Sequence, residues 1–291
     1  MTEPIGPVLS IPPKDLPAFA AGAEPYIIGP ESLPQLDVPR GEVIQYRWLS
    51  ERIYPDTARD YWLYVPQQYD PAQPACLMVF QDGAFYLGPE CNTPFVFDNL
   101  IHKGDMPVTI GLFVNPGDKG PGLPIYGGTD NRSMEYDSLG DQYARFLLEE
   151  LLPEIEKSYN ITNDPEGRGI CGMSSGGICA FNVAWERPDA FGKVITHCGS
   201  YTNIRGGHNV PSMVRKTERK ALRVFLQSGV HDLNVIFGNW PIANQDMAAA
   251  LAYREYDYQF VLGEGYHTLK HGGSILPDTM RWLWRDYHKG G

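Results

Sequence analysis

The sequence contains no long apolar run and few cysteines. None of its 291 residues lies in a stretch approaching the roughly 18 consecutive apolar residues of a membrane-spanning helix. The five cysteines are an odd number without a C-x-x-C pair: Cys76, Cys91, Cys171, Cys179 and Cys198. Disulfide frameworks and zinc sites use paired spacings, so neither is indicated. We therefore expect no metal ion, no disulfide and no membrane partner.

Positive charge is also scarce. The chain has 24 Lys and Arg against 35 Asp and Glu, a formal net charge of −11 at pH 7. Such a surface repels phosphate backbones, and the densest basic run, residues 215–223, is interrupted by Glu218. We therefore expect no nucleic-acid partner. With 43% hydrophobic and 20% charged residues, the composition is that of a globular protein, which excludes a disordered chain, a collagen-like fibre or a coiled coil.

The first residues lack a basic segment followed by an apolar core, so no signal peptide is visible. The compartment stays open between the cytoplasm and a secreted or periplasmic location reached by a chain whose signal has been removed, and the sequence does not indicate an oligomeric state. Residues 1–40 are rich in proline and show no periodic pattern, which predicts an extended N-terminal arm. We expect residues 41–291 to form a single domain.

From residue 41 onward, candidate strands alternate with candidate helices. The apolar or alternating stretches expected to form strands are residues 43–49, 61–65, 76–80, 108–114, 169–171, 193–198, 222–226 and 259–262. Helical spacing marks residues 141–159, with a kink at Pro153, residues 177–186, a helix that Pro241 starts and a last helix that Pro277 starts. This alternation predicts an α/β fold whose mostly parallel sheet of about eight strands is flanked by helices and opened by an antiparallel pair.

Residues 172–176 read Gly-Met-Ser-Ser-Gly, a G-x-S-x-G pattern between a predicted strand and a predicted helix. A strand-to-helix turn this sharp has no room for side chains two positions before and after its serine, and it lifts the serine hydroxyl above the sheet. The helix N-terminus behind that serine favours developing negative charge. The pattern predicts Ser174 as a nucleophile, against a tight structural turn. Ser175 fits the pattern less well because the bulky Met173 lies two residues before it.

Two histidines, His267 and His271, follow the final predicted strand and precede the final helix. This architecture supplies the base for a serine nucleophile from that loop. His267, in the glycine-rich stretch 263–267, is the first choice, and His271 remains the alternative. Two histidines four residues apart can also bind a metal on a helix, but the surrounding glycines favour a loop.

The third group expected is a carboxylate after the preceding strand. Asp232 has that position, and the competing interpretation is an aspartate that caps a turn. An oxyanion hole needs two backbone N–H groups, which we expect from Ser175 and Ala84, with Gly83 as the alternative to Ala84. Asp82 in the same loop is interpreted as a structural hydrogen-bonding residue.

Together these segments resemble the putative-esterase family, which includes esterase D, enterochelin esterase, and the feruloyl and acetyl-xylan esterases of carbohydrate esterase family one. The resemblance covers roughly residues 41–287 and is carried by residues 80–83, 131–137, 147–159, 169–177 and 263–273. It implies an α/β-hydrolase fold, no cofactor, and ester hydrolysis through an acyl-enzyme, with the nucleophile at Ser174, the acid at Asp232 and the base at His267. Many members have Gly-Gly-His at the base, whereas Tyr266 stands at the second glycine here.

Arg132 and Glu135 are expected to form a structural ion pair beside this site. Aromatic walls suit a cinnamoyl or sugar ring. The candidates near predicted strand ends are Phe85, Trp240, Tyr266 and Tyr201, and the glycine-rich stretch 116–140, with Tyr126 and Met134, is a candidate cover. The preferred hypothesis is a serine esterase acting on feruloyl or acetyl esters of plant carbohydrate. Its alternatives are an enterochelin (siderophore trilactone) esterase and a non-catalytic binding protein on a hydrolase fold.

Overall fold

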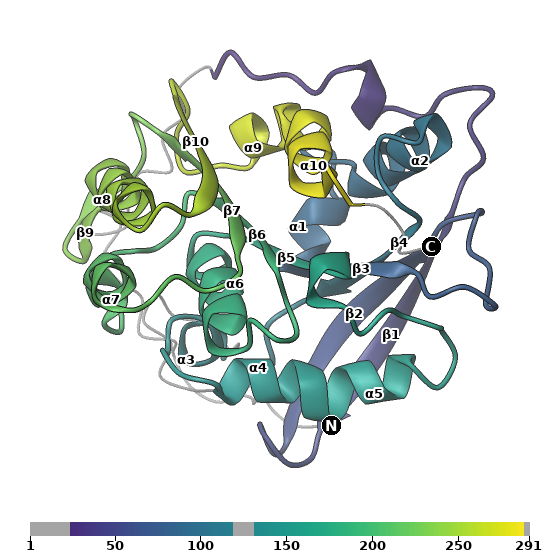
Figure 1. The fold of residues 1–291 in the computed structure, drawn as a ribbon, viewed down its shortest axis with the longest axis horizontal. Coiled ribbons are helices and arrows are strands. Elements are labelled where there is room, and N and C mark those ends of the chain that lie inside the picture. The colour runs from purple at the N-terminus through teal and green to yellow at the C-terminus, as the bar shows by residue number, and fades with distance from the viewer. Residues whose placement is uncertain (1–23, 119–130, 288–291) are drawn as a thin grey trace, which may run out of the picture.

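A computed structural model describes residues 24–118 and 131–287 of the chain. Its main sheet has eight strands in the order β1-β2-β4-β3-β5-β6-β7-β10. The pairs β1–β2 and β2–β4 are antiparallel, and all the others are parallel. The predicted sheet of about eight mostly parallel strands, opened by an antiparallel pair, is confirmed (Figure 1).

The strands of the main sheet are β1 (Glu42–Ser50), β2 (Thr57–Val65), β3 (Cys76–Gln81), β4 (Thr109–Val114), β5 (Arg168–Met173), β6 (Lys193–His197), β7 (Arg223–Gly229) and β10 (Asp257–Gly263), and β8 (Asn234–Val235) with β9 (Gly238–Asn239) forms a small ribbon. The α-helices are α1 (Gly83–Leu87), α2 (Thr93–Lys103), α3 (Arg132–Tyr136), α4 (Gln142–Phe146), α5 (Leu152–Ile155), α6 (Ser175–Glu186), α7 (Val210–Lys216), α8 (Trp240–Tyr253), α9 (Lys270–Ser274) and α10 (Leu276–Trp284). Short 3₁₀ turns are η1 (Pro30–Ser32), η3 (Pro165–Gly167) and η4 (Gly207–Asn209), and η2 (Leu147–Leu151) is a π turn.

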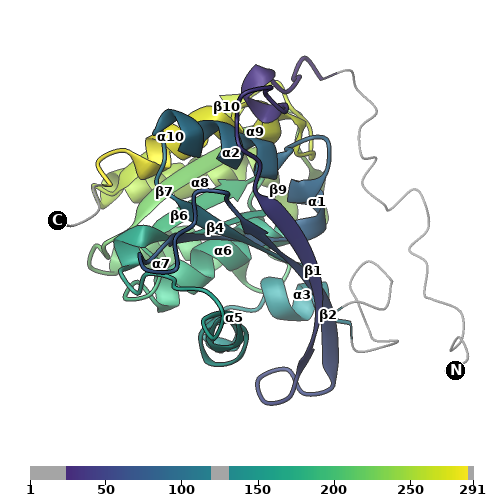
Figure 2. The same cartoon turned by 90° about the vertical axis from the view of Figure 1, so that its right-hand side faces the viewer.

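Helices cover both faces of the sheet, so its central strands are apolar on both sides. In β3 successive side chains point to opposite faces. Leu77 and Val79 belong to a core shared with α4, α6, α7 and α8, whereas Met78 and Phe80 belong to a core shared with α2 and α10. Figure 2 shows α2 and α10 on one side of the strands and α6 and α7 on the other. None of the helices in the described part of the chain is both long and apolar enough to cross a bilayer.

The segment predicted as one helix, residues 141–159, is helical over residues 142–155. It is divided into α4, the π turn η2 and α5, and Pro153 lies in the first turn of α5. Proline has no N–H to donate to the carbonyl four residues earlier, that of Glu149. The guanidinium of Arg52 donates to that carbonyl instead. The proline predicted to kink the helix thus lies next to a local change of helix type.

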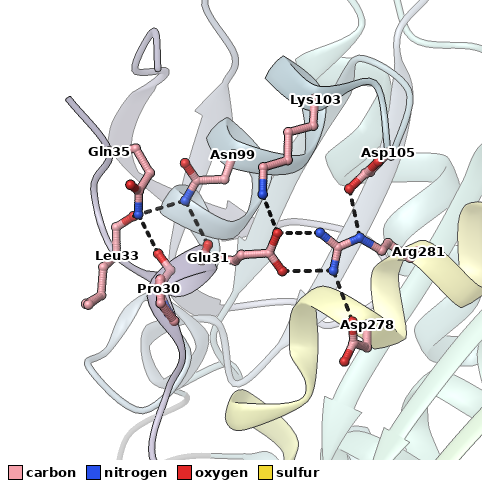
Figure 3. A network of polar contacts seen from close by, with 9 residues as sticks. All are labelled: Pro30, Glu31, Leu33, Gln35, Asn99, Lys103, Asp105, Asp278 and Arg281. Atoms are coloured by element: carbon pink, nitrogen blue, oxygen red, sulfur yellow. Dashed lines mark hydrogen bonds and ion pairs between the residues drawn. The ribbon is translucent and has the colours of Figure 1, made fainter. Parts of the chain in front are cut away.

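Residues 24–40 cross the face formed by α9, α10 and α2 before entering β1 (Figure 1). The Glu31 carboxylate contacts the side chains of Lys103 and Arg281, and the Asn99 amide donates to the carbonyl oxygens of Glu31 and Leu33 (Figure 3). These contacts fasten the segment to α2 and α10. The remainder of the predicted arm, residues 1–23, lies outside the described residues.

Candidate active site

Ser174 lies in the turn between β5 and α6, with φ +58° and ψ −122°. A positive φ is costly for a residue with a side chain and persists where the surroundings enforce it. A Cβ on Gly172 would lie 2.1 Å from the Gly176 carbonyl oxygen, and one on Gly176 would lie 2.9 Å from Oδ2 of Asp82. Both glycines of the motif are therefore required sterically, and the turn has its corner at Ser174 rather than Ser175.

Three side chains from separate strand ends meet at this corner. Nε2 of His267 lies 2.9 Å from Oγ of Ser174, and Nδ1 of His267 lies 2.6 Å from Oδ1 of Asp232. Asp232 follows β7 and His267 follows β10, and their side chains are 0% and 7% exposed. The Leu233 N–H and the Ser228 hydroxyl also donate to the Asp232 carboxylate, at 2.6 and 3.2 Å. This arrangement can transfer a proton from the Ser174 hydroxyl to an imidazole that the carboxylate orients.

His271, the alternative base, has other neighbours. Its Nδ1 lies 3.1 Å from Nε2 of Gln227, and its ring stacks on Tyr26 with 3.9 Å between centroids. Burial lowers the pKa of His271. These contacts make it a packed neighbour of the His267 loop.

Cys198, Asp232 and His267 have donor atoms within 4.8 Å of one another. Two ligands of a tetrahedral ion with bonds of about 2 Å are about 3.3 Å apart, whereas Asp232 and His267 are joined directly at 2.6 Å. Burial also raises the pKa of the Cys198 thiol, which disfavours the thiolate that binds metals. The cluster therefore suits a proton relay better than an ion.

The two predicted oxyanion donors have different surroundings. Ser175 is the first residue of α6, so its N–H lies among those that find no partner within the helix. The Ala84 N–H donates to Oδ1 of Asn115, at 3.0 Å. A substrate oxygen would have to replace the Asn115 oxygen to use the Ala84 N–H. Gly83 has no space for a side chain, because a Cβ there would lie 2.4 Å from the backbone of Phe113.

The expected ion pair between Arg132 and Glu135 is not formed, which corrects the sequence prediction. Arg132 contacts the Asp82 carboxylate with two nitrogens, at 2.8 and 2.7 Å, which agrees with the interpretation of Asp82 as a structural residue. Glu135 instead binds Arg59 of β2 through two hydrogen bonds, at 2.6 and 3.0 Å. Because α3 lies between β2 and the loop after β3, each charged side chain reaches a partner on a different segment.

Ser200 is a site residue that the sequence analysis missed. Its hydroxyl lies 3.2 Å from Oγ of Ser174 and accepts a hydrogen bond from Nε1 of Trp240 at 3.2 Å. The Trp240 and His267 rings also pack edge to face, with 5.8 Å between centroids. Its position in the sequence could have indicated it, because Ser200 follows β6 at the same edge of the sheet as Ser174.

The four aromatic candidates differ in exposure. Phe85 on α1 is 60% exposed, and Tyr266 is partly exposed and stacks on His231. Tyr201 and Trp240 are each 1% exposed, and Tyr201 packs against Phe181 in the core. Of these four rings, only those of Phe85 and Tyr266 are open to solvent. Of the stretch 116–140, residues 119–130 with Tyr126 lie outside the described residues, and Met134 on α3 is half exposed.

The comparison with known proteins gives the family. A model of the protein family described as Putative esterase matches residues 54–269. The chain belongs to this family. The match begins just before β2 and ends just after His267, so it spans the segments that hold Ser174, Asp232 and His267.

Curated relatives in the family include the iron(III) enterobactin esterase of Dickeya dadantii, which is 27% identical over 256 residues, 81% of this chain and 53% of that protein. The iron(III) enterobactin esterase of Escherichia coli strain K12 is 24% identical over 209 residues, 70% of this chain and 48% of that protein. The chain thus spans about half the length of these relatives.

Solved structures of esterases share the fold. A ferulic acid esterase superposes with a TM-score of 0.67 at 18% identity, over 86% of this chain and 100% of that chain. A ferulic acid esterase from Anaeromyces mucronatus gives 0.68 at 16% identity, over 89% and 97%. The enterobactin esterase of Shigella flexneri gives 0.67 at 19% identity, over 86% and 62%. The fold is therefore that of α/β-hydrolase esterases.

Proposed function

We propose that this protein is a carboxylic-ester hydrolase that works through an acyl-enzyme on Ser174. The observation that carries the proposal is the hydrogen-bonded series from Ser174 through His267 to Asp232, with distances of 2.9 and 2.6 Å. Membership of the esterase family supports it.

In the proposed reaction, Nε2 of His267 accepts the proton of the Ser174 hydroxyl as Oγ attacks the ester carbonyl. The Asp232 carboxylate stabilises the imidazolium that forms. The negative charge on the former carbonyl oxygen is stabilised by the N–H groups of Ser175 and Ala84, the latter after Asn115 is displaced. His267 then protonates the departing alcohol, and water, activated by the same histidine, releases the acid from Ser174.

For the substrate we propose feruloyl or acetyl esters of plant carbohydrate. The exposed ring of Phe85 on α1 and the partly exposed ring of Tyr266, next to His267, suit a planar or sugar ring. Nearly all of two ferulic acid esterase chains has a counterpart in this fold. The sequence similarity to enterobactin esterases favours a second candidate, a siderophore trilactone.

The first test is the initial rate on p-nitrophenyl acetate together with labelling by a fluorophosphonate probe. We expect Ser174→Ala and His267→Ala to lose activity by about a thousandfold or more, because each removes a member of the triad. His271→Ala, four residues further on in α9, removes the alternative base and should cost no more than about tenfold, because His267 remains. A folded Ser174→Ala protein that keeps more than roughly a tenth of the wild-type rate contradicts the assignment, and a wild-type protein that the probe does not label points to a non-catalytic binding protein.

The second test compares methyl ferulate with ferric enterobactin as substrates of the wild-type protein. A higher kcat/KM for methyl ferulate is expected if Phe85 and Tyr266 hold the acyl ring. The opposite preference would replace the plant-ester proposal with the siderophore one while leaving the proposed triad intact.

A further inference from the structure

The loop that carries His267, residues 264–269, lies between β10 and α9 and has no helix or strand of its own. On its inner side, the Val230 N–H donates to the Gly263 carbonyl at 2.8 Å, and the His231 N–H donates to the Gly265 carbonyl at 3.2 Å. These bonds hold the start of the loop to the segment that carries Asp232. They do not reach the residues that follow His267.

The N-terminal segment holds the outer side of the same loop. Oη of Tyr26 accepts a hydrogen bond from the Glu264 N–H at 2.8 Å, and Oε1 of Glu24 accepts one from the Thr268 hydroxyl at 2.8 Å. The Tyr26 ring also lies flat on His271, at a 4° angle and 3.9 Å between centroids. Glu24 and Tyr26 thus contact residues on both sides of His267, three before it and one and four after it.

The fit between this segment and the loop is close. A Cβ on Gly263 would lie 2.2 Å from Oη of Tyr26 and 2.3 Å from Cε1 of His271. The glycine at the end of β10 therefore admits the tyrosine hydroxyl and the His271 ring beside the backbone. Ile27, the residue after Tyr26, is 84% exposed and makes none of these contacts.

We infer that Glu24 and Tyr26 are positioning residues that hold the His267 loop in the geometry required for proton transfer from Ser174. The inference rests on the proposed function, since it assigns these residues to the same site. The bond from Asp232 orients the imidazole ring but not the backbone that carries it. A displacement of about 1 Å at a catalytic group can cost a hundredfold in rate, so a brace on the flanks of His267 acts on kcat.

The experiment measures kcat and KM on p-nitrophenyl acetate and the rate of fluorophosphonate labelling for the full chain. The variants are Tyr26→Ala, Tyr26→Phe, Glu24→Ala and Glu24→Gln, with Ile27→Ala as the matched control. Circular dichroism and Tm establish that each is folded. Tyr26→Phe and Glu24→Gln are mild enough to serve where the alanine variants do not fold.

We expect Tyr26→Ala to lower kcat and the labelling rate about tenfold, with KM unchanged within about twofold. Tyr26→Phe keeps the ring on His271 and should lose only about threefold. Glu24→Ala should lose about fivefold, whereas Glu24→Gln keeps an oxygen for the Thr268 hydroxyl and should recover most of that loss. Ile27→Ala should match the wild type.

Three results would overturn the inference. The first is kcat and labelling within about twofold of wild type in all four variants at Glu24 and Tyr26. The second is an equal loss in Ile27→Ala, and the third is a rise in KM with kcat unchanged, which would indicate substrate contact rather than positioning. A wild-type protein that neither hydrolyses the ester nor reacts with the probe overturns the proposed function itself, and the inference with it.

Discussion

At the nucleophile, Ser200 determines how the Ser174 hydroxyl can be oriented. The Trp240 indole N–H can only donate, so the Ser200 oxygen accepts from it and the Ser200 proton remains available for Oγ of Ser174. With that bond in place, the Ser174 proton is directed to His267. In the proposed reaction, Ser200 and Trp240 thereby orient the Ser174 oxygen for attack.

Removing the Ser200 hydroxyl should consequently affect rate and stability together. We expect Ser200→Ala to lower kcat by about three- to tenfold and to destabilise the fold by about 1–3 kcal/mol, since it leaves the buried Trp240 N–H without an acceptor. Trp240→Phe removes the donor instead and should spare more of kcat, because Ser200 can still contact Ser174. Steady-state kinetics and urea unfolding of both variants test this. Equal loss of kcat in the two would contradict the stated direction of the bonds.

The residues of the site differ in how far a sequence can indicate them. Ser174, Asp232 and His267 could be predicted because each follows a strand whose apolar residues are recognisable in the sequence. For Ser174, the G-x-S-x-G pattern adds a steric requirement. The partners of Arg132 and Glu135 could not be predicted, because Asp82 and Arg59 lie 50 and 76 positions away in the sequence. The contacts of Glu24 and Tyr26 could not be predicted either, because an irregular segment has no periodicity to show which side chains point inward.

Among the elements, α3 is fixed by a buried ion pair with β2. The side chains of Arg59 and Glu135 are both 0% exposed, and the guanidinium lies over the Phe146 ring at 4.0 Å. Oε2 of Glu135 also accepts the Gly117 N–H at 3.1 Å. Glu135 thus holds both Gly117, which precedes residues 119–130, and its own helix α3, which follows them.

Breaking this pair should be costly. We expect Glu135→Gln to lower the free energy of unfolding by about 3–5 kcal/mol, because it leaves the charge of Arg59 buried without its counterion. The exposed pair of Arg145 and Glu149 provides the control, and Glu149→Gln should cause no measurable change. Urea unfolding measures both. A small effect of Glu135→Gln would mean that Arg59 is neutralised by other contacts.

The strands and helices were the part of the fold that could be predicted from the sequence. All eight strands of the main sheet overlap predicted stretches, because runs such as 76–80 and 108–114 are apolar on both faces. Helix α2 was not predicted, although Pro94 lies in its first turn and Gly104 ends it. In the π turn before Pro153, the Glu149 carbonyl accepts a hydrogen bond from Arg52, a residue 97 positions away. Contacts of that separation leave no local pattern.

For the molecule as a whole, buried histidines should govern acid stability. Burial, and then the nearby His271, lowers the pKa of His197 from 6.5 to about 3. The unfolded chain therefore binds a proton below pH 6.5 that the folded protein does not bind until about pH 3. Stability is lost as pH falls through that window. Hydrogen bonds from Arg281 and then Lys103 lower the pKa of Glu31 from 4.5 to about 2, so its contribution is lost below about pH 4.5.

We expect the free energy of unfolding of the wild type to fall with decreasing pH below about 6.5, at up to about 1.4 kcal/mol per pH unit for each buried histidine that stays neutral. His197→Gln should reduce that slope between about pH 6 and pH 5 by about 1.4 kcal/mol per pH unit, which corresponds to one bound proton, even if it lowers stability overall. Asn203→Gln, which introduces the same side chain at an exposed position without removing a titratable group, should leave the slope unchanged. Urea titrations at several pH values measure the slopes. Identical slopes in the wild type and His197→Gln would show that His197 is not the group responsible.

The hydrogen bond between Thr268 and Glu24 joins residues 244 positions apart, close to both ends of the described chain. The turn at Ser174 joins β5 to α6, which are consecutive in the chain. The proposed base follows β10, and its brace comes from residues that precede β1 and must wait for that strand. During synthesis the proposed nucleophile is therefore in the chain long before the proposed base. The complete series from Ser174 to Asp232 can form only after β10 has been added.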